Sequence, residues 1–299
     1  MDSEELINRF VTDLKIRRKS PSTLITYSYT IKAFSTFIDG NLLTVTKNKL
    51  VEYLETMVAK NFRQPTIVRY FVVIREFYKF LIYNNLYNLP NPISDKFWRY
   101  YLEVYKGGAP GVRRCPTTDE VITLLNSVLN TRDKAVLTLL FATGIRRKEL
   151  SELDRSDVNL ETGTIILKET RKRTNRTVFI NPEAIFILRR YLNRREDDNP
   201  ALFISRDGTR LGLLPIDVLF KKAVKHAGLY RGDETENALT PHCCRHWFTT
   251  TLFNASMRSE YIGFLRGDKP KTSAGVYIHI IPELVKAEYL RCMPRFGLI

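Results

Sequence analysis

Apolar side chains recur every three or four residues through the first hundred positions, which is the spacing of one face of an α-helix. Ser3, Ser22, Thr46 and Pro65 mark the starts of four such stretches. The fourth is rich in aromatic residues, which we interpret as core rather than as a platform for stacked bases. It ends before Leu-Pro-Asn-Pro at 89–92, because a residue that precedes proline avoids the helical conformation. The pattern therefore predicts four helices.

The chain changes character after an aromatic, helix-compatible segment at 94–105. Residues 106–114 read Lys-Gly-Gly-Ala-Pro-Gly-Val-Arg-Arg, and Gly and Pro at that density are typical of a linker. A length of 299 residues also favours about two domains. We therefore expect a helical domain at 1–105, a linker at 106–114 and a second domain at 115–299.

The second domain begins with the capping box Thr-Thr-Asp-Glu at 117–120, and an apolar run at 135–141 predicts a buried helix that ends at Gly144. Two segments rich in branched residues, 164–168 and 176–180, predict strands joined by a polar turn. Helical spacing returns afterwards at 183–195, 215–227, 242–254 and 257–264, with shorter pieces around 272–278 and 282–292. The predicted fold is mainly α with one small β-sheet, and no internal repeat is present.

The charge balance points to a polyanionic partner. Lys and Arg number 47 against 32 Asp and Glu, a formal net charge of +15. A soluble chain this basic usually meets a polyanion. The basic residues also cluster, which favours phosphate neutralisation over a uniformly solubilised surface. One cluster holds Arg171, Lys172, Arg173 and Arg176, and another holds Arg189, Arg190, Arg194 and Arg195.

Several classes of protein are disfavoured. The four cysteines show no Cys-x-x-Cys spacing, which indicates reduced thiols and an intracellular protein. The acidic N-terminus lacks the apolar region of a signal peptide, and no apolar run approaches the roughly 20 residues of a membrane span. We expect a cytoplasmic, nucleoid-associated protein of a prokaryote or infected host, with no membrane contact. The four histidines show no metal-ligand spacing and a P-loop is absent, so no metal and no cofactor are expected.

Three separated motifs carry the candidate chemistry. Residues 142–150 read Ala-Thr-Gly-Ile-Arg-Arg-Lys-Glu-Leu, so Arg146 follows a Thr-Gly turn at a helix end. His242 and Arg245 lie one turn apart at the start of a predicted helix and share a face. Tyr277 lies in Gly-Val-Tyr-Ile-His at 275–279. Arginines can hold two oxygens of one phosphate, and a tyrosine can attack the phosphorus and retain the strand as an ester.

This series of motifs resembles the tyrosine recombinase (phage integrase) family, with matching positions from about 117 to 289. The first hundred residues resemble the helical, SAM-like core-binding domain of that family. The resemblance implies a site-specific DNA recombinase that cleaves and rejoins double-stranded DNA through a covalent 3′-phosphotyrosine. It implies no cofactor, and four protomers that act on two duplexes.

The resemblance also implies roles for individual residues. Arg146 and Arg245 match the arginines that hold the non-bridging oxygens of the scissile phosphate. Tyr277 matches the nucleophile, for which Tyr261 and Tyr289 are the local competitors. His242 matches the histidine that helps to take the tyrosine proton or binds the phosphate. The acidic position three residues after the first arginine is Glu149, which would orient Arg146 or the neighbouring histidine.

The family's general acid is a lysine on the β-hairpin. Lys172 is the first choice because it lies in the turn, and Lys168 is the alternative. Counting back from Arg176 places an arginine in the family's usual register, and arginine is a poor proton donor because of its very high pKa. The remaining basic residues here, and the linker arginines, are expected to contact the DNA backbone: Arg171, Arg173, Arg176, Arg113 and Arg114.

The chain departs from the family at 265–268, Leu-Arg-Gly-Asp, where Leu-Gly-His is usual and Asp268 takes the place of the histidine. An anion beside a phosphate is costly unless a cation offsets it. Asp268 could pair with Arg245 or Arg266, accept a hydrogen bond from the tyrosine, or cap the next segment and point away. This departure keeps a second hypothesis open, a relative that binds DNA without turnover.

Three further points complete the expectations. A type IB topoisomerase shares the chemistry, but the short layout with a helical first domain favours a recombinase. Cys243 and Cys244 lie in the spacer of His-x-x-Arg, so we interpret them as packing residues rather than nucleophiles. Residues 281–290 form an amphipathic segment that either docks on a neighbouring protomer or packs on its own domain.

Overall fold

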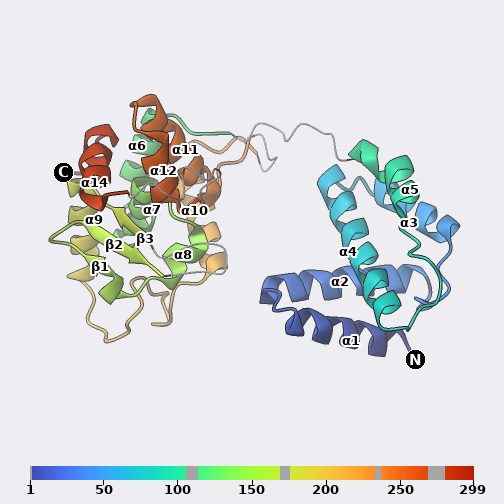
Figure 1. Ribbon diagram of the computed structural model, residues 1–299. Coiled ribbons are helices and arrows are strands. Elements are labelled where there is room, and N and C mark those ends of the chain that lie inside the picture. Colours follow the sequence, from blue (N-terminus) through green and yellow to red (C-terminus); the bar gives the residue numbers. More distant parts are fainter. Residues whose placement is uncertain (1, 106–113, 169–175, 233–236, 269–279) are drawn as a thin grey trace. The chain divides into compact units, whose positions relative to one another are not determined.

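The structure is a computed structural model that describes residues 2–105, 114–168, 176–232, 237–268 and 280–299 (Figure 1). The chain divides into two compact units, Met1–Pro110 and Gly111–Ile299. The division falls within the segment expected to be a linker, most of which lies outside the described residues. Each unit is described by itself.

All four predicted helices are present in the first unit. They are α1 (Ser3–Ile16), α2 (Pro21–Phe37), α3 (Lys47–Ala59) and α4 (Gln64–Tyr83). A short α5 (Asp95–Phe97) continues into a π-helical turn (Trp98–Leu102) and a 3-10 turn (Glu103–Tyr105). The N-cap of α1 is Asp2 rather than the expected Ser3, because the Asp2 carboxylate accepts from the backbone N–H of Glu5 at 2.7 Å.

The aromatic residues of α4 form the core of this unit, as the pattern predicted. Phe71, Phe77 and Tyr78 are fully buried. Phe77 meets Phe10 of α1 edge to face with ring centroids 5.3 Å apart. Because these rings are buried against one another, they hold the first unit together. For the same reason they are not available to stack on bases.

The second unit wraps helices around a small sheet. Its helices are α6 (Thr118–Ser127), α7 (Thr131–Thr143), α8 (Arg147–Glu152), α9 (Pro182–Leu192), α10 (Leu213–His226), α11 (Pro241–Asn254), α12 (Ser259–Arg266) and α14 (Pro282–Cys292). The strands β1 (Val158–Asn159), β2 (Thr164–Leu167) and β3 (Arg176–Phe179) form an antiparallel sheet in that order. The mainly α fold with one small sheet is confirmed. The sequence pattern missed α8 and β1, which are too short to show a period.

Helix α7 is the buried centre of the unit, since every residue from Ala135 to Thr143 is buried. It packs against α9 and α11. On α11, Cys243 and Cys244 are both buried within the core, which confirms them as packing residues. Helix α14 buries Val285 and Tyr289 against its own unit, and the predicted piece at 272–278 lies outside the described residues.

Candidate active site

The turn that presents Arg146 depends on Gly144. Helix α7 ends at Thr143, and Gly144 follows it in the left-handed conformation with φ 59°. A Cβ on Gly144 would lie 2.5 Å from the side chain of Phe248. Glycine is therefore required here both by the backbone conformation and by the close approach of α11. The chain reverses and Arg146 becomes the N-cap of α8.

Arg245 is fixed to this same turn from a distant part of the chain. Pro241 lies in the first turn of α11, and His242 and Arg245 follow on one face. The Arg245 side chain is only 6% exposed. Its Nη1 donates to the carbonyl oxygen of Gly144 at 3.0 Å, and its Nη2 donates to that of Arg266 at 2.9 Å. The two arginine motifs, which are a hundred residues apart in sequence, thus meet.

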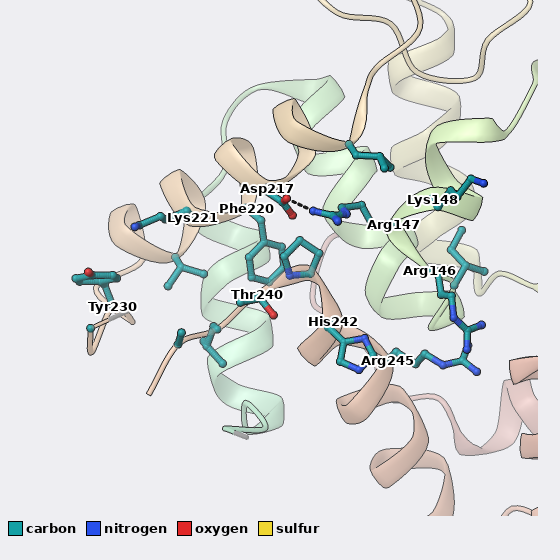
Figure 2. Close-up of a pocket in the computed structure, with 17 residues that line it drawn as sticks. Arg146, Arg147, Lys148, Asp217, Phe220, Lys221, Tyr230, Thr240, His242 and Arg245 are labelled. Carbon is teal, nitrogen blue, oxygen red and sulfur yellow. Dashed lines mark hydrogen bonds and ion pairs between the residues drawn. The ribbon is translucent and has the colours of Figure 1, made fainter. Parts of the chain in front are cut away.

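Arg146, His242 and Arg245 line one pocket of about 600 Å³ (Figure 2). The side chains of Arg146 and Arg245 converge, with His242 beside them. Other cations line the same pocket, including Arg147, which forms an ion pair with Asp217 of α10. The excess of positive groups suits the pocket to an anion such as a phosphate.

Glu149, three residues after Arg146, joins two segments. Its Oε2 accepts from the backbone N–H of Arg146 at 2.7 Å, and its Oε1 accepts from Nη2 of Arg176 at 3.0 Å. Arg176 in turn donates from Nε to the carbonyl oxygen of Leu265 at 3.0 Å. Glu149 is 8% exposed and the Arg176 side chain 2% exposed. The expectation that Arg176 contacts DNA is therefore wrong, because its guanidinium is buried against Glu149 and Leu265.

Asp268 faces the arginines. Helix α12 ends at Arg266, and Gly267 turns the chain with φ 62°. The Asp268 carboxylate lies 3.4 Å from Nη2 of Arg245 and 3.0 Å from Nε of Arg266. The alternative in which it points away is thus wrong, and pairing with both arginines is what the structure has. The residue in the family's histidine place therefore brings a negative charge to the arginine that was expected to hold a phosphate.

Of the two candidate general acids, Lys168 belongs to the described residues. Lys172 lies outside the described residues. Lys168 follows β2 directly, and its Nζ lies 2.8 Å from Asp154 and 3.2 Å from Asp157. The hydrogen bonds to Asp154 and Asp157 raise the pKa of Lys168 above its ordinary value. A lysine held by two carboxylates gives up its proton less readily than an ordinary one, which disfavours Lys168 as the general acid.

The competing tyrosines are built into the core. Tyr289 is fully buried and its hydroxyl donates to the carbonyl oxygen of Ala142 at 2.8 Å. Burial raises the pKa of Tyr289 far above that of an exposed phenol. Tyr261 is 8% exposed and packs beneath the guanidinium of Arg258. Neither phenol is open to a DNA strand, whereas Tyr277 lies outside the described residues.

Two more basic residues turn out to be structural. Arg114, expected to follow the DNA backbone, has a side chain that is 9% exposed, pairs with Glu120 and donates to the carbonyl oxygen of Leu229 at 2.8 Å. Arg195 has a side chain that is 3% exposed and pairs with Asp197. Both arginines are therefore internal. Arg113, Arg171 and Arg173 lie outside the described residues.

The sequence reasoning missed the buried position of Arg176, although a signal was available. Strand residues alternate between faces, so Arg176 shares a face with Val178, which is fully buried. The ion pair between Arg147 and Asp217 was also missed, and no local pattern indicates it.

Comparison with known proteins identifies the class. The phage integrase family matches residues 116–283, and the N-terminal SAM-like domain of phage integrases matches residues 7–85. The chain belongs to the phage integrase family. It is a tyrosine-type site-specific recombinase, an enzyme that breaks and rejoins DNA. No helix among the described residues is long and apolar enough to cross a membrane.

The relatives match over nearly the full length. The chain is 26% identical to tyrosine recombinase XerA of Saccharolobus solfataricus, over 98% of this chain and 94% of that protein. It is also 26% identical to tyrosine recombinase XerD of Proteus mirabilis, over the same shares. The structure of the Tn1549 transposon integrase in complex with transposon right end DNA has a TM-score of 0.72 at 18% identity, covering 97% of this chain and 99% of that one. A lambda integrase dimer bound to a core site gives 0.71 at 17% identity, covering 94% and 99%, and both likenesses concern the fold.

Proposed function

We propose that the phenol oxygen of Tyr277 attacks a phosphodiester of a duplex recombination site that is held by Arg146 and Arg245. The convergence of these two arginines and His242 on one pocket is the observation that carries the proposal. The attack forms a 3′-phosphotyrosyl ester and breaks the bond from phosphorus to the 5′-oxygen. The 5′-hydroxyl of a partner duplex then attacks the ester, which conserves the bond energy without a cofactor.

The arginines act by favouring the transition state. Negative charge grows on the non-bridging oxygens as phosphorus becomes five-coordinate, so cations already in place stabilise that state more than the ground state. Arg245 meets this requirement because two backbone carbonyl oxygens hold its guanidinium. Its orientation therefore needs little change when DNA binds. The turn that presents Arg146 is likewise held in place, because the Glu149 carboxylate accepts from the Arg146 backbone N–H.

Two proton transfers complete the step. Lys172 donates a proton to the departing 5′-oxygen, because an alkoxide is too basic to leave readily, and a positioned acid is worth about 10²–10⁴-fold. His242 helps to take the phenol proton or binds the phosphate. Its ring meets that of His246 edge to face with centroids 4.8 Å apart, so a second imidazole of α11 lies beside the one that lines the pocket.

The partner is double-stranded DNA, and we propose that four protomers act on two duplexes. A lambda integrase dimer bound to a core site and the Tn1549 integrase in complex with DNA support a duplex partner. We retain the predicted domains at 1–105 and 115–299 with their linker at 106–114, and expect both domains to contact the duplex, with Arg171 and Arg173 on its backbone.

Covalent trapping tests the proposal. Wild type and Tyr277→Phe are incubated without metal with nicked duplexes that carry candidate sites, then separated on a denaturing gel. We expect a DNA–protein band for wild type only. DNA binding without a covalent band, across sites and pH, would instead support the second hypothesis, a relative that binds DNA without turnover. The aspartate in place of the family's histidine, Asp268, is what keeps that hypothesis open.

A further inference from the structure

A buried arginine outside the phosphate pocket contacts two segments that bear proposed catalytic side chains and begins the strand that follows a third. Arg176 begins β3, and its side chain is 2% exposed. It was expected at the DNA surface, yet its guanidinium is enclosed by protein. A charge is costly to bury, so its partners indicate what it does.

The first contact leads to Arg146. Arg176 Nη2 donates to Oε1 of Glu149 at 3.0 Å, while Oε2 of the same carboxylate accepts from the backbone N–H of Arg146 at 2.7 Å. One carboxylate therefore connects Arg176 to the turn that presents the first arginine. A shift of either end would break a charge-assisted hydrogen bond, which is among the stronger contacts available.

The second contact leads to the end of α12. Arg176 Nε donates to the carbonyl oxygen of Leu265 at 3.0 Å. A Cβ on Gly267 would lie 2.8 Å from the Arg176 guanidinium, so the guanidinium packs directly against this turn. Asp268 follows Gly267 and pairs with Arg245. The segment that continues to Tyr277 thus leaves α12 from a point that Arg176 fixes.

The third connection runs along the chain. Arg176 is the first residue of β3 and lies opposite Leu167, the last residue of β2, and residues 169–175, which include Lys172, join these two strands in sequence. On the other strand, Lys168 is held by Asp154 and Asp157 at 2.8 and 3.2 Å. Ion pairs therefore hold Lys168 and Arg176, the described residues on the two sides of 169–175.

We propose that Arg176 is a positioning residue that sets the Arg146 turn, the start of β3, which follows Lys172 by four residues, and the end of α12 relative to one another. The inference rests on the proposed function. An arginine suits this task because its planar guanidinium donates in fixed directions to acceptors on different elements, whereas the ammonium of lysine is a single point. Displacements near 1 Å at such positions can slow a reaction about 10²-fold.

Single-turnover cleavage by Arg176→Lys tests the proposal with two substrates. One is an ordinary nicked site, and the other has sulfur in place of the bridging 5′-oxygen. A thiolate leaves without a proton, so this substrate does not need the acid on the hairpin. We expect a loss of about 30–100-fold on the ordinary site, of which about tenfold or more is recovered with sulfur, while DNA affinity stays within about threefold.

Arg195→Lys is the matched control. Arg195 is also a buried arginine, with a carboxylate partner in Asp197 and carbonyl partners in Ala201 and Leu202. A purely stabilising arginine should lower the melting temperature when changed but leave the folded enzyme with its normal cleavage rate. We expect that result for Arg195→Lys and not for Arg176→Lys.

The outcomes separate the two proposals. An absence of covalent product from wild type would contradict the proposed function. An active wild type with a normal rate for Arg176→Lys, or an equal loss in Arg195→Lys, would overturn the positioning role. An equal loss on both substrates would overturn the part of the proposal that concerns Lys172. If Arg176→Lys does not fold, Arg176→Gln with Glu149→Gln replaces the ion pair by two amides, leaves no buried charge, and is judged by the same comparison.

Discussion

At the scale of single residues, the unusual group is Asp268, whose carboxylate lies 3.4 Å from Nη2 of Arg245. A negative charge at this place repels the phosphate that Arg245 is proposed to hold. Asp268→Asn removes the charge with little change of shape, so we expect tighter binding of site DNA. The gain should be about two- to fivefold, because the pair is partly exposed and screened by solvent.

Equilibrium binding of a labelled site by Asp268→Asn measures the effect. Glu260→Gln is the control, since Glu260 is an exposed carboxylate on α12, the helix that precedes Asp268. Weaker binding by Asp268→Asn would show that the carboxylate organises Arg245 for the phosphate rather than competing with it.

The two hairpin lysines give a second test at this scale. Lys168 is held by Asp154 and Asp157, and their hydrogen bonds raise its pKa, so it keeps its proton to a higher pH than an ordinary lysine. Lys172→Ala should slow cleavage about 10²–10⁴-fold, whereas Lys168→Ala should slow it by less than about tenfold.

Single-turnover rates of the two variants, measured from neutral to alkaline pH, decide between the lysines. The shape of the alkaline profile should be the same in wild type and Lys168→Ala, because Lys168, whose pKa the two carboxylates raise, is not the proposed acid. A larger loss in Lys168→Ala than in Lys172→Ala would reverse the assignment.

At the scale of elements, the turn after α7 couples packing to the site. Gly144→Ala places a residue with a Cβ at φ 59°, with that Cβ 2.5 Å from the buried ring of Phe248. Strain and overpacking together should lower the free energy of unfolding by about 2–4 kcal/mol. Cleavage should fall as well, because Arg245 donates to the Gly144 carbonyl oxygen.

Urea unfolding of Gly144→Ala and Gly228→Ala separates the two causes. Gly228 follows α10 with φ 71°, and a Cβ there meets no atom within 4 Å. Gly228→Ala should therefore cost only the backbone strain, about 1 kcal/mol, and leave cleavage unchanged. Equal losses of stability in the two variants would mean that Phe248 yields without cost.

The elements also show what the sequence could predict. Helices such as α4 were found because a long apolar stripe repeats with the helical period, and the meeting of Arg146 with Arg245 followed from their motifs. Arginine burial could not be predicted in the same way. Arg114 and Arg195 look like surface cations in sequence. For Arg176 the strand alternation with Val178 was a signal, but its carboxylate partner Glu149 lies 27 residues away in sequence and only folding brings the two together.

At the scale of the whole molecule, the net charge of +15 makes DNA affinity depend on salt. Each phosphate that a cation neutralises releases counterions, so the logarithm of the binding constant should fall with the logarithm of salt concentration by about 0.9 per contact. Between 50 and 200 mM salt, 6–10 such contacts would weaken binding about 10³–10⁵-fold.

The slope of that plot also tells surface cations from internal ones. Arg173→Ala removes a proposed backbone contact and should reduce the slope by about 0.9. Arg114→Gln should leave the slope unchanged, because the Arg114 guanidinium is bound internally by Glu120 and by the carbonyl oxygen of Leu229. DNA-binding titrations of both variants and wild type at several salt concentrations, below their melting temperatures, measure the three slopes. An affinity that does not change with salt would rule out a binding face built on phosphate contacts, whatever the fate of the catalytic residues.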